Sequence, residues 1–284
     1  MARLSQLPYS AEGCAMFLIK DRLNRPWKRL CKALIQPYLR SQQISLSIED
    51  GLKLLFVPGW LYFPYKVAKE QRRCEPELSI LRDIVPKNRM AIDVGSNRGI
   101  YSYALSRIAD SVEAFEPNPN MARFAAAMLG SRARVHACAL AEYEGTATLY
   151  IPKTIDAVSL HLLASLGNVH PMETSTLEVR VTRLDTFGFD NVGFIKIDVE
   201  GGEEQVIEGA QQTIDRNRPN LLVEMVGGHT QEDAAGRIRK IKQRFGYDAW
   251  IFVGKTKLDA FQALRDCAAT LRTRNVAFTP KPVG

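Results

Sequence analysis

The segment with the clearest capacity for chemistry is a glycine-containing turn after an apolar run, Asp93-Val94-Gly95-Ser96-Asn97-Arg98-Gly99. Glycine lets the backbone turn sharply and come close to a ligand. A helix that follows such a turn presents free N–H groups, which favour an anionic group. A dinucleotide site would have the spacing GxGxxG, whereas this turn has GxNxG with an acid two residues before it. The acid would repel a pyrophosphate but attract a ligand that also carries positive charge.

A second carboxylate, Glu116, follows the next predicted strand and comes 17 residues after Gly99. At the carboxyl end of a strand in a parallel sheet, a carboxylate can accept both ribose hydroxyls of an adenosine. The alternative is a helix cap or a surface salt bridge. S-adenosylmethionine combines an adenosine with an ammonium, a sulfonium and a carboxylate. It is therefore the predicted cofactor, with binding residues Asp93, Gly95, Ser96, Asn97, Gly99 and Glu116.

Three charged residues alternate along a later predicted strand, Phe194–Val199, and its end. Lys196, Asp198 and Glu200 share one face of that strand. Such a cluster is either a structural ion-pair network or a functional site. Methyl transfer is an in-line displacement that needs alignment, exclusion of water and, for an alcohol acceptor, a base. We expect Asp198 to orient the cofactor or acceptor and Glu200 to act as the base, so both are candidate catalytic residues.

Other candidate bases lie in irregular segments or at a further strand end. His161 and His170 fall where a lid could bring one of them to the acceptor, and Glu224 and His229 end or follow another strand. A free imidazole titrates near pH ~6.5 and is a workable base. No set of histidines, cysteines and carboxylates has the spacing of a metal site. The sequence therefore assigns no metal ligands and leaves metal dependence open.

The elements that must position these groups alternate between strands and helices from residue 89 onward. Such repeats predict an α/β fold with a doubly wound, Rossmann-like, mostly parallel sheet. The predicted strands are Met90–Val94, Val112–Phe115, Arg134–Ala139, Phe194–Val199, Leu221–Met225, Trp250–Val253 and Val276–Thr279. The predicted helices are Gly99–Ala109, Met121–Leu129, Glu203–Ile214, Gln231–Phe245 and Leu258–Leu271.

Two stretches depart from this alternation and set the predicted organisation. Residues 1–85 form an N-terminal extension, and residues 86–284 form the main domain with an insertion at about 142–191. The extension has a predicted basic helix, a hairpin and a second helix, at Trp27–Tyr38, Ile44–Ser47 with Leu52–Val57, and Pro76–Val85. The insertion has a predicted hairpin around an irregular piece, at Thr146–Ile151 and Thr176–Val181 around Pro152–Ser175. Long irregular pieces are usually lids or binding loops.

Composition excludes several classes of protein. The five cysteines are scattered without a CxxC pair, which is typical of reduced thiols in a cytoplasmic protein. The longest uncharged run, Leu54–Tyr65, has twelve residues, whereas a membrane span needs about 20. No secretory signal is visible. We expect a soluble, cytoplasmic protein.

The net charge of +7 is concentrated in residues 20–40, which carry +6. These residues form either a solvated helix face or a docking surface for an anionic membrane or acceptor, so the protein could be membrane-peripheral. Nucleic acid is not an expected partner, because no basic stripe with interleaved aromatic residues continues elsewhere.

Several stretches of the chain resemble FkbM-type methyltransferases. They are Ala91–Tyr101, Phe115-Glu116-Pro117, Lys196–Glu203, Gly209-Ala210 and Leu221–Glu224, and the similarity spans roughly residues 45–280. The resemblance implies a class I methyltransferase fold, with seven strands of which the last is antiparallel. It also implies O-methylation of a hydroxyl on a sugar, a glycan or another natural product.

The resemblance also assigns roles by position. The turn positions Asp93, Gly95, Asn97 and Gly99 match the surroundings of the methionine portion, Glu116 matches the ribose-binding acid, and Asp198 matches the acid beside the reactive methyl group. The sequence departs from the wider class where its third strand ends in Cys138-Ala139-Leu140, without the Asp that often meets the adenine amino group. We expect the backbone of Ala139 and the side chain of Asn118 to contact the adenine instead.

Two other functions stay open at this point. One is an NAD-dependent oxidoreductase, which the missing GxGxxG spacing argues against. The other is a non-catalytic binding module that keeps the fold, which the presence of Asp93, Glu116 and Asp198 argues against. The sequence determines neither the methyl acceptor nor the oligomeric state.

Overall fold

The structure is a computed structural model that describes residues 53, 56–73, 75–152, 174–225, 231–253, 256–266 and 275–282. The chain divides into two compact units, residues 1–56 and 57–284, and the second carries the fold described below. The predicted helix Trp27–Tyr38 and strand Ile44–Ser47 lie outside the described residues. Of the predicted strand Leu52–Val57, only Lys53, Phe56 and Val57 are described, and they are helical or in a bend instead of extended. The division at residue 85 stays a prediction.

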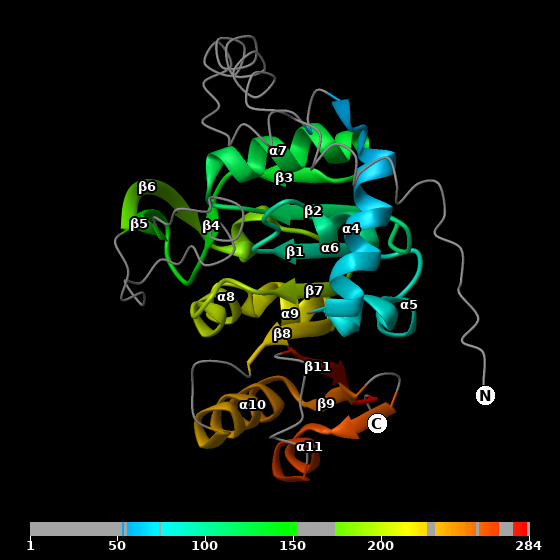
Figure 1. The fold of residues 1–284 in the computed structure, drawn as a ribbon. Helices are drawn as coiled ribbons and strands as arrows, with labels where there is room; N and C mark the ends of the chain where they lie inside the picture. Colours follow the sequence, from blue (N-terminus) through cyan, green and yellow to red (C-terminus); the bar gives the residue numbers. More distant parts are fainter. Residues whose placement is uncertain are drawn as a thin grey trace, which may run out of the picture. The chain divides into compact units, whose positions relative to one another are not determined.

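An eight-stranded sheet forms the centre of this unit, in the order β10-β9-β11-β8-β7-β1-β2-β3 (Figure 1). The strands are β1 (Met90–Val94), β2 (Ser111–Phe115), β3 (Arg134–His136), β7 (Val192–Ile197), β8 (Asn220–Glu224), β9 (Tyr247–Val253), β10 (Thr256–Asp259) and β11 (Asn275–Pro280). From β3 to β8 all neighbours are parallel. The last strand, β11, inserts antiparallel between β8 and β9. The predicted doubly wound, mostly parallel sheet with an antiparallel last strand is confirmed, although it has eight strands where seven were expected, because β10 adds an edge strand.

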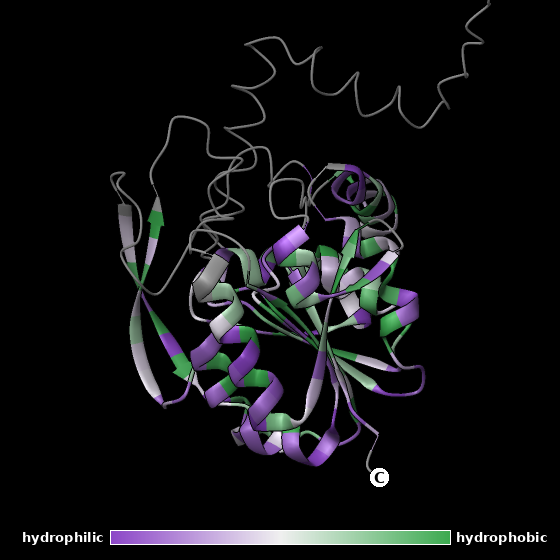
Figure 2. Cartoon of the chain, turned by 90° about the horizontal axis from the view of Figure 1, so that it is seen from below, coloured by the Kyte–Doolittle hydropathy of each residue, from purple (hydrophilic) through white to green (hydrophobic). Residues whose placement is uncertain are grey.

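Alternating side chains place apolar groups on both faces of the sheet, which is why it is buried from both sides. Ile195 and Ile197 of β7 pack in one core cluster with residues of the helices that follow β7 and β8. Phe194, on the opposite face, packs in a second cluster with Leu105 and Leu81. The strands at the centre of Figure 2 are largely green, and the helices around them combine green with purple.

Helices cover these faces. They are α4 (Gly59–Arg73), α5 (Leu81–Ile84), α6 (Ile100–Leu105), α7 (Pro119–Leu129), α8 (Glu203–Glu208), α9 (Gln211–Asn217), α10 (Gln231–Phe245) and α11 (Ala260–Asp266), with short 3-10 turns η1 (Pro76–Ser79), η2 (Gly130–Arg132) and η4 (Leu184–Phe187). The sequence did not predict α4, because Pro58, Gly59 and Pro64 are typical of helix breaks. Pro58 nevertheless suits the helix start, where its carbonyl accepts from the N–H groups of Leu61 and Tyr62.

Three predicted helices differ from the structure. The predicted helix Pro76–Val85 is divided into η1 and α5, and the helix predicted over Gly99–Ala109 ends at Leu105. The helix predicted over Glu203–Ile214 breaks at Gly209. There the carbonyl of Gly209 accepts from the N–H of Asp185, and the Asp185 carboxylate accepts from the N–H groups of Gln212 and Thr213 at the start of α9. A tertiary contact, which no local pattern reveals, therefore starts a new helix.

The C-terminal helix prediction, Leu258–Leu271, is wrong at its start. Residues Thr256–Asp259 form the edge strand β10, which pairs antiparallel with β9. The carboxylate of Asp259 then accepts from the N–H groups of Phe261 and Gln262 and caps α11. Asp is a favoured helix cap, and its position marks the boundary.

A second, three-stranded sheet has the order β4-β6-β5, with β4 at Ala139–Leu140, β5 at Gly145–Pro152 and β6 at Thr174–Thr182. Strands β5 and β6 pair antiparallel, so the predicted hairpin of the insertion is confirmed. The predicted third strand, Arg134–Ala139, is divided between the two sheets, because β3 ends at His136 and β4 pairs with β6. No helix in the described part of the chain is both long and apolar enough to cross a membrane.

Candidate functional site

The glycine turn and two neighbouring strand ends meet at one edge of the central sheet. The N–H groups of Gly95 and Ser96 donate to the carbonyl of Phe115, the last residue of β2. On the other side, the N–H of Asp198 donates to the carbonyl of Val94 at 3.0 Å. The predicted sites around Asp93, Glu116 and Asp198 are therefore brought together at the carboxyl ends of three adjacent parallel strands, where open α/β sheets bind their ligands.

The two glycines of the turn are required by contacts within the protein. Gly95 has φ +81°, and a Cβ added there would lie 1.8 Å from the backbone oxygen of Asp198. Gly99 has φ +80°, and its Cβ would lie 2.8 Å from a methyl carbon of Leu129. The sequence prediction attributed these glycines to a sharp backbone turn and to close approach of a ligand. The structure shows that they also let the turn pack against β7 and α7.

Glu116 is buried directly after β2, and each of its oxygens accepts a backbone hydrogen bond. The N–H of Asn97 donates to one oxygen and the N–H of Asn118 donates to the other, both at 2.8 Å. Burial raises the pKa of Glu116 to about 7, and these two hydrogen bonds oppose the rise. Each carboxylate oxygen has two lone pairs, so Glu116 keeps acceptor capacity for further donors.

Two buried polar atoms on residues around Glu116 have no hydrogen-bond partner within the described residues. One is Asn118 Nδ2, on a residue whose N–H donates to Glu116, and the other is Ser96 Oγ, on the residue before Asn97, whose N–H also donates to Glu116. The Oδ1 atom of Asn118 is used, because it accepts from the N–H of Asn120 at 3.0 Å and caps α7. Buried polar groups are normally paired. A hydroxyl and an amide donor left over on residues around an acid therefore fit a polar ligand such as a nucleoside.

Asp93 is fully buried at the end of β1. Its carboxylate accepts from the hydroxyl of Ser102 on α6 at 2.5 Å, and it pairs in register with Lys196 of β7. Burial raises the pKa of Asp93, and Lys196 opposes the rise. Asp93 therefore connects the strand end before the turn to α6 and interacts with the positive charge of Lys196 on the neighbouring strand.

Lys196 is buried on the same face of β7 as Phe194, as its position in the strand predicts. Its ammonium donates to a carboxylate oxygen of Asp198 at 2.7 Å and lies 4.4 Å from the ring centre of Tyr101. Burial alone would lower the pKa of Lys196, but Asp198, Glu75 and Asp93 together outweigh burial and raise it. Lys196 is therefore a permanent cation that holds Asp198.

Beyond β7 the chain turns sharply, with positive φ angles of 55° at Glu200 and 113° at Gly201. Glu203 stabilises this turn, because its carboxylate accepts from the N–H of Gly201 at 3.0 Å. Arg237 of α10 donates to the other oxygen of Glu203 at 2.9 Å. The turn fixes where Glu200 points.

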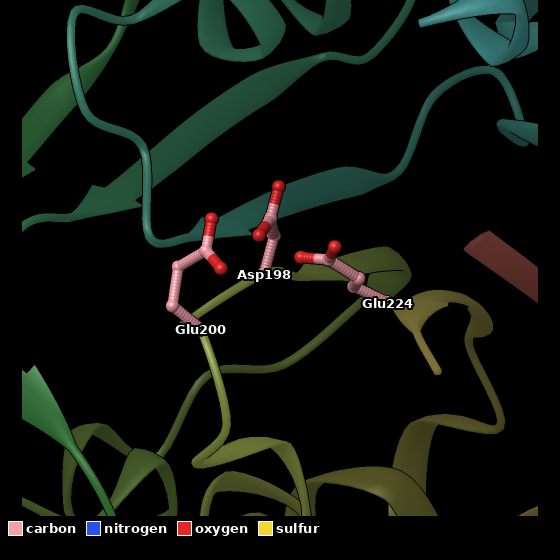
Figure 3. Close-up of side chains that lie close together, drawn as sticks. All are labelled: Asp198, Glu200 and Glu224. Carbon is pink, nitrogen blue, oxygen red and sulfur yellow. The ribbon is translucent and has the colours of Figure 1, made fainter. Parts of the chain in front are cut away.

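The carboxylates of Asp198, Glu200 and Glu224 point toward one another (Figure 3), and one oxygen of each lies within 4.8 Å of the others. Carboxylates this close repel, so the group favours a cation or a shared proton. Oxygen ligands of this kind suit Mg²⁺ or Ca²⁺, and spacing in the sequence did not reveal the group because β7 and β8 each supply part of it. The assignment of no metal ligands stays a prediction.

The remaining predicted residues are placed as follows. Ala139 lies in β4 of the second sheet, so its adenine contact stays a prediction, as does that of Asn118. His161, His170 and His229 lie outside the described residues. Sequence reasoning missed Glu75, Tyr101, Ser102 and Glu203, which have no motif spacing of their own.

Comparison with known proteins identifies the domain. The model described as the Methyltransferase FkbM domain matches residues 93–249, and no curated protein matches the chain. Among solved structures, the methyltransferase FkbM from Methylobacillus flagellatus KT is 16% identical with a TM-score of 0.45, over 68% of this chain and 44% of that one. The chain thus spans less than half of that protein's length.

Two further solved structures are similar over most of their length. A candidate methyltransferase from Streptococcus mutans in complex with SAH is 10% identical with a TM-score of 0.41, over 72% of this chain and 94% of that one. An rRNA methylase from Streptococcus thermophilus is 9% identical with a TM-score of 0.41, over 72% and 95%. These TM-scores are all below 0.5, so the assignment depends on the domain match. Because that match covers more than half of the chain, from the acid of the glycine turn to β9, the protein belongs to the FkbM methyltransferase domain family.

Proposed function

We propose that the protein is an S-adenosylmethionine-dependent methyltransferase that methylates a hydroxyl of a small molecule or glycan. The observation that carries the proposal is the buried Glu116 carboxylate, one strand away from the Asp93 turn, with Ser96 Oγ and Asn118 Nδ2, on residues around it, left without partners within the described residues. The Glu116 carboxylate has lone pairs that can accept from the ribose hydroxyls of an adenosine. The Ser96 hydroxyl and the Asn118 amide can donate to acceptors on its base.

Bound S-adenosylmethionine would supply an activated methyl group on a positively charged sulfur. Glu116 would hold the ribose, and the turn from Asp93 to Gly99 would hold the methionine portion. Asp198, fixed by Lys196 at 2.7 Å, would contribute negative charge near the sulfonium. Orientation and a preorganised charge are the main contributions that a protein can make to such a displacement.

A hydroxyl acceptor must lose its proton, and Glu200 is the proposed base. Its position in the turn after β7, close to Asp198 and Glu224, supports this role, because an ionised carboxylate can take up the proton of a hydroxyl.

Replacing Glu116 with alanine should weaken binding of S-adenosylhomocysteine by roughly tenfold or more, because two hydrogen bonds to a charged acceptor are lost. Isothermal titration calorimetry measures the change. Glu113→Gln, on β2 three residues before Glu116 and bonded to His136, is the matched control and should bind normally. If folded wild-type protein binds neither S-adenosylmethionine nor S-adenosylhomocysteine, the proposed function is wrong.

Binding should also depend on pH through Glu116. Its pKa is raised to about 7, and ribose hydroxyls donate to the ionised form, so ligand binding is linked to loss of a proton. Affinity should be constant above pH ~7 and fall toward a limit of about tenfold per pH unit below it. Calorimetry with S-adenosylhomocysteine between pH 5.5 and 8.5 tests this. In Glu116→Gln the affinity for S-adenosylhomocysteine should change less steeply with pH between pH 6 and 8. An unchanged pH dependence would show that another group titrates.

The acceptor is best found by incubating the protein with labelled S-adenosylmethionine and extracts of its source cells. A labelled small molecule or glycan would support the proposal, whereas tight cofactor binding without transfer to any acceptor would favour a non-catalytic module. A rise in melting temperature with NAD but not with S-adenosylhomocysteine would favour an oxidoreductase.

We further propose a cytoplasmic location, with peripheral contact to anionic membranes through basic residues 20–40.

A further inference from the structure

An acid from outside the matched family domain reaches the charged groups at the candidate site. Glu75 precedes η1, and its N–H donates to the carbonyl of Glu70 in α4 at 2.9 Å. Its carboxylate accepts from the hydroxyl of Tyr101 on α6 at 2.9 Å. The family model matches from residue 93, so Glu75 lies 18 residues before the start of that match.

Glu75 and Tyr101 form a short chain of contacts that leads to Asp198. The ring of Tyr101 lies under the Lys196 ammonium, 4.4 Å from ring centre to nitrogen, and that ammonium holds Asp198 at 2.7 Å. Lys196 interacts electrostatically with Asp198, Glu75 and Asp93. Three carboxylates thus share one buried ammonium.

The negative charge of Glu75 is the feature that a purely structural role leaves unexplained. Tyr101 needs only an acceptor for its hydroxyl, and a glutamine carbonyl would serve equally well. Burying a carboxylate costs free energy, and burial indeed raises the pKa of Glu75, which Lys196 partly opposes; Asp198 and Glu70 raise it further, and Tyr101 lowers it. Lys196 is therefore the cation that favours the ionised form of Glu75 at this buried position.

We infer that Glu75 determines the preference of the site for the cationic cofactor over its neutral product, an inference that rests on the proposed function. Glu75 competes with Asp198 for the charge of Lys196, which leaves Asp198 with more uncompensated negative charge toward the sulfonium. Opposite charges a few ångströms apart in a partly buried site attract strongly. After transfer the sulfonium becomes an uncharged thioether, so the attraction is lost and the product is released more readily.

The test compares the affinities of the folded full-length protein for S-adenosylmethionine and S-adenosylhomocysteine by calorimetry. Glu75→Gln keeps the acceptor for Tyr101 but removes the charge. It should reduce the preference for S-adenosylmethionine, expressed as the ratio of the two dissociation constants, by roughly three- to tenfold. Sinefungin, which carries an amine near the position of the sulfonium, should lose affinity in parallel with S-adenosylmethionine.

Controls separate a charge effect from a structural one. Glu75→Asp keeps the charge and should keep the ratio, and Glu178→Gln removes an exposed carboxylate on β6 and should also leave it unchanged. If Glu75→Gln does not fold, Tyr101→Phe takes its place. Loss of the hydroxyl removes a hydrogen bond that lowers the pKa of Glu75, which favours the neutral form of Glu75 and should lower the ratio. Equal weakening of both ligands, or no change in either, would overturn the inference. Absence of binding by the wild-type protein would instead refute the proposed function, and the inference with it.

Discussion

Replacing Lys196 with methionine is expected to lower the free energy of unfolding by about 3–5 kcal/mol, because the change leaves buried carboxylates without their cation. Asp198 loses the ammonium at 2.7 Å, and Asp93 and Glu75 lose the positive charge that opposes the rise in their pKa. Methionine fills a similar volume, so the loss reports charge and not a cavity.

The pH dependence of this variant follows from the sign of the shifts. The pKa of Asp93 and that of Glu75 are already raised, and removal of Lys196 raises them further. A folded-state pKa above the unfolded value costs stability as pH rises through it. The variant should therefore be closest to wild type near pH 5 and fall furthest behind it near pH 8.

Chemical denaturation at pH 5 and pH 8, followed by circular dichroism, measures the effect. Lys257→Met is the matched control, because Lys257 lies 3.9 Å above the Trp250 ring but is exposed. The Lys257→Met change should lower the free energy of unfolding by no more than about 1 kcal/mol. A Lys196 variant as stable as the Lys257 variant at pH 8 would contradict the ion-pair account of the cluster.

Replacing Gly95 with alanine should cost about 2–4 kcal/mol of stability and weaken cofactor binding roughly a hundredfold. The new Cβ would lie 1.8 Å from the backbone oxygen of Asp198, a distance at which the backbone must move. Separation of the turn from the end of β7 displaces the groups proposed to hold the methionine portion. Both effects have the same cause, so they should appear together.

Gly188→Ala separates the clash from the cost of backbone conformation. Gly188 also has a positive φ, of 62°, but a Cβ there meets nothing within 4 Å. The free energy of unfolding of this variant should fall by only about 1 kcal/mol, and the variant should bind the cofactor normally. Thermal unfolding and calorimetry on both proteins give the comparison. Equal losses in the two variants would show that close packing against Asp198 does not matter.

Much of the site was predictable because it is local. The acid-led turn at Asp93, the acid at Glu116 and the alternation that puts Lys196 and Ile197 on opposite faces of β7 each follow from a few consecutive residues. A strand has a period of two, and parallel strands present their carboxyl ends at one edge. These two rules suffice to bring the strand ends together.

What the sequence determined by itself is most of the strand–helix alternation of the main sheet, the turn, and the strand ends that carry the acids, because periodicity and glycine chemistry are properties of short segments. The tertiary structure alone decided the contacts of other acids that support the site and the fold. Glu75 reaches Tyr101 across 26 residues, Glu203 holds the turn of Glu200 together with Arg237, and Asp185 starts α9. A charged group that packing takes out of water needs a hydrogen-bond or ion-pair partner. That partner is often distant in the sequence, so a local pattern does not reveal it.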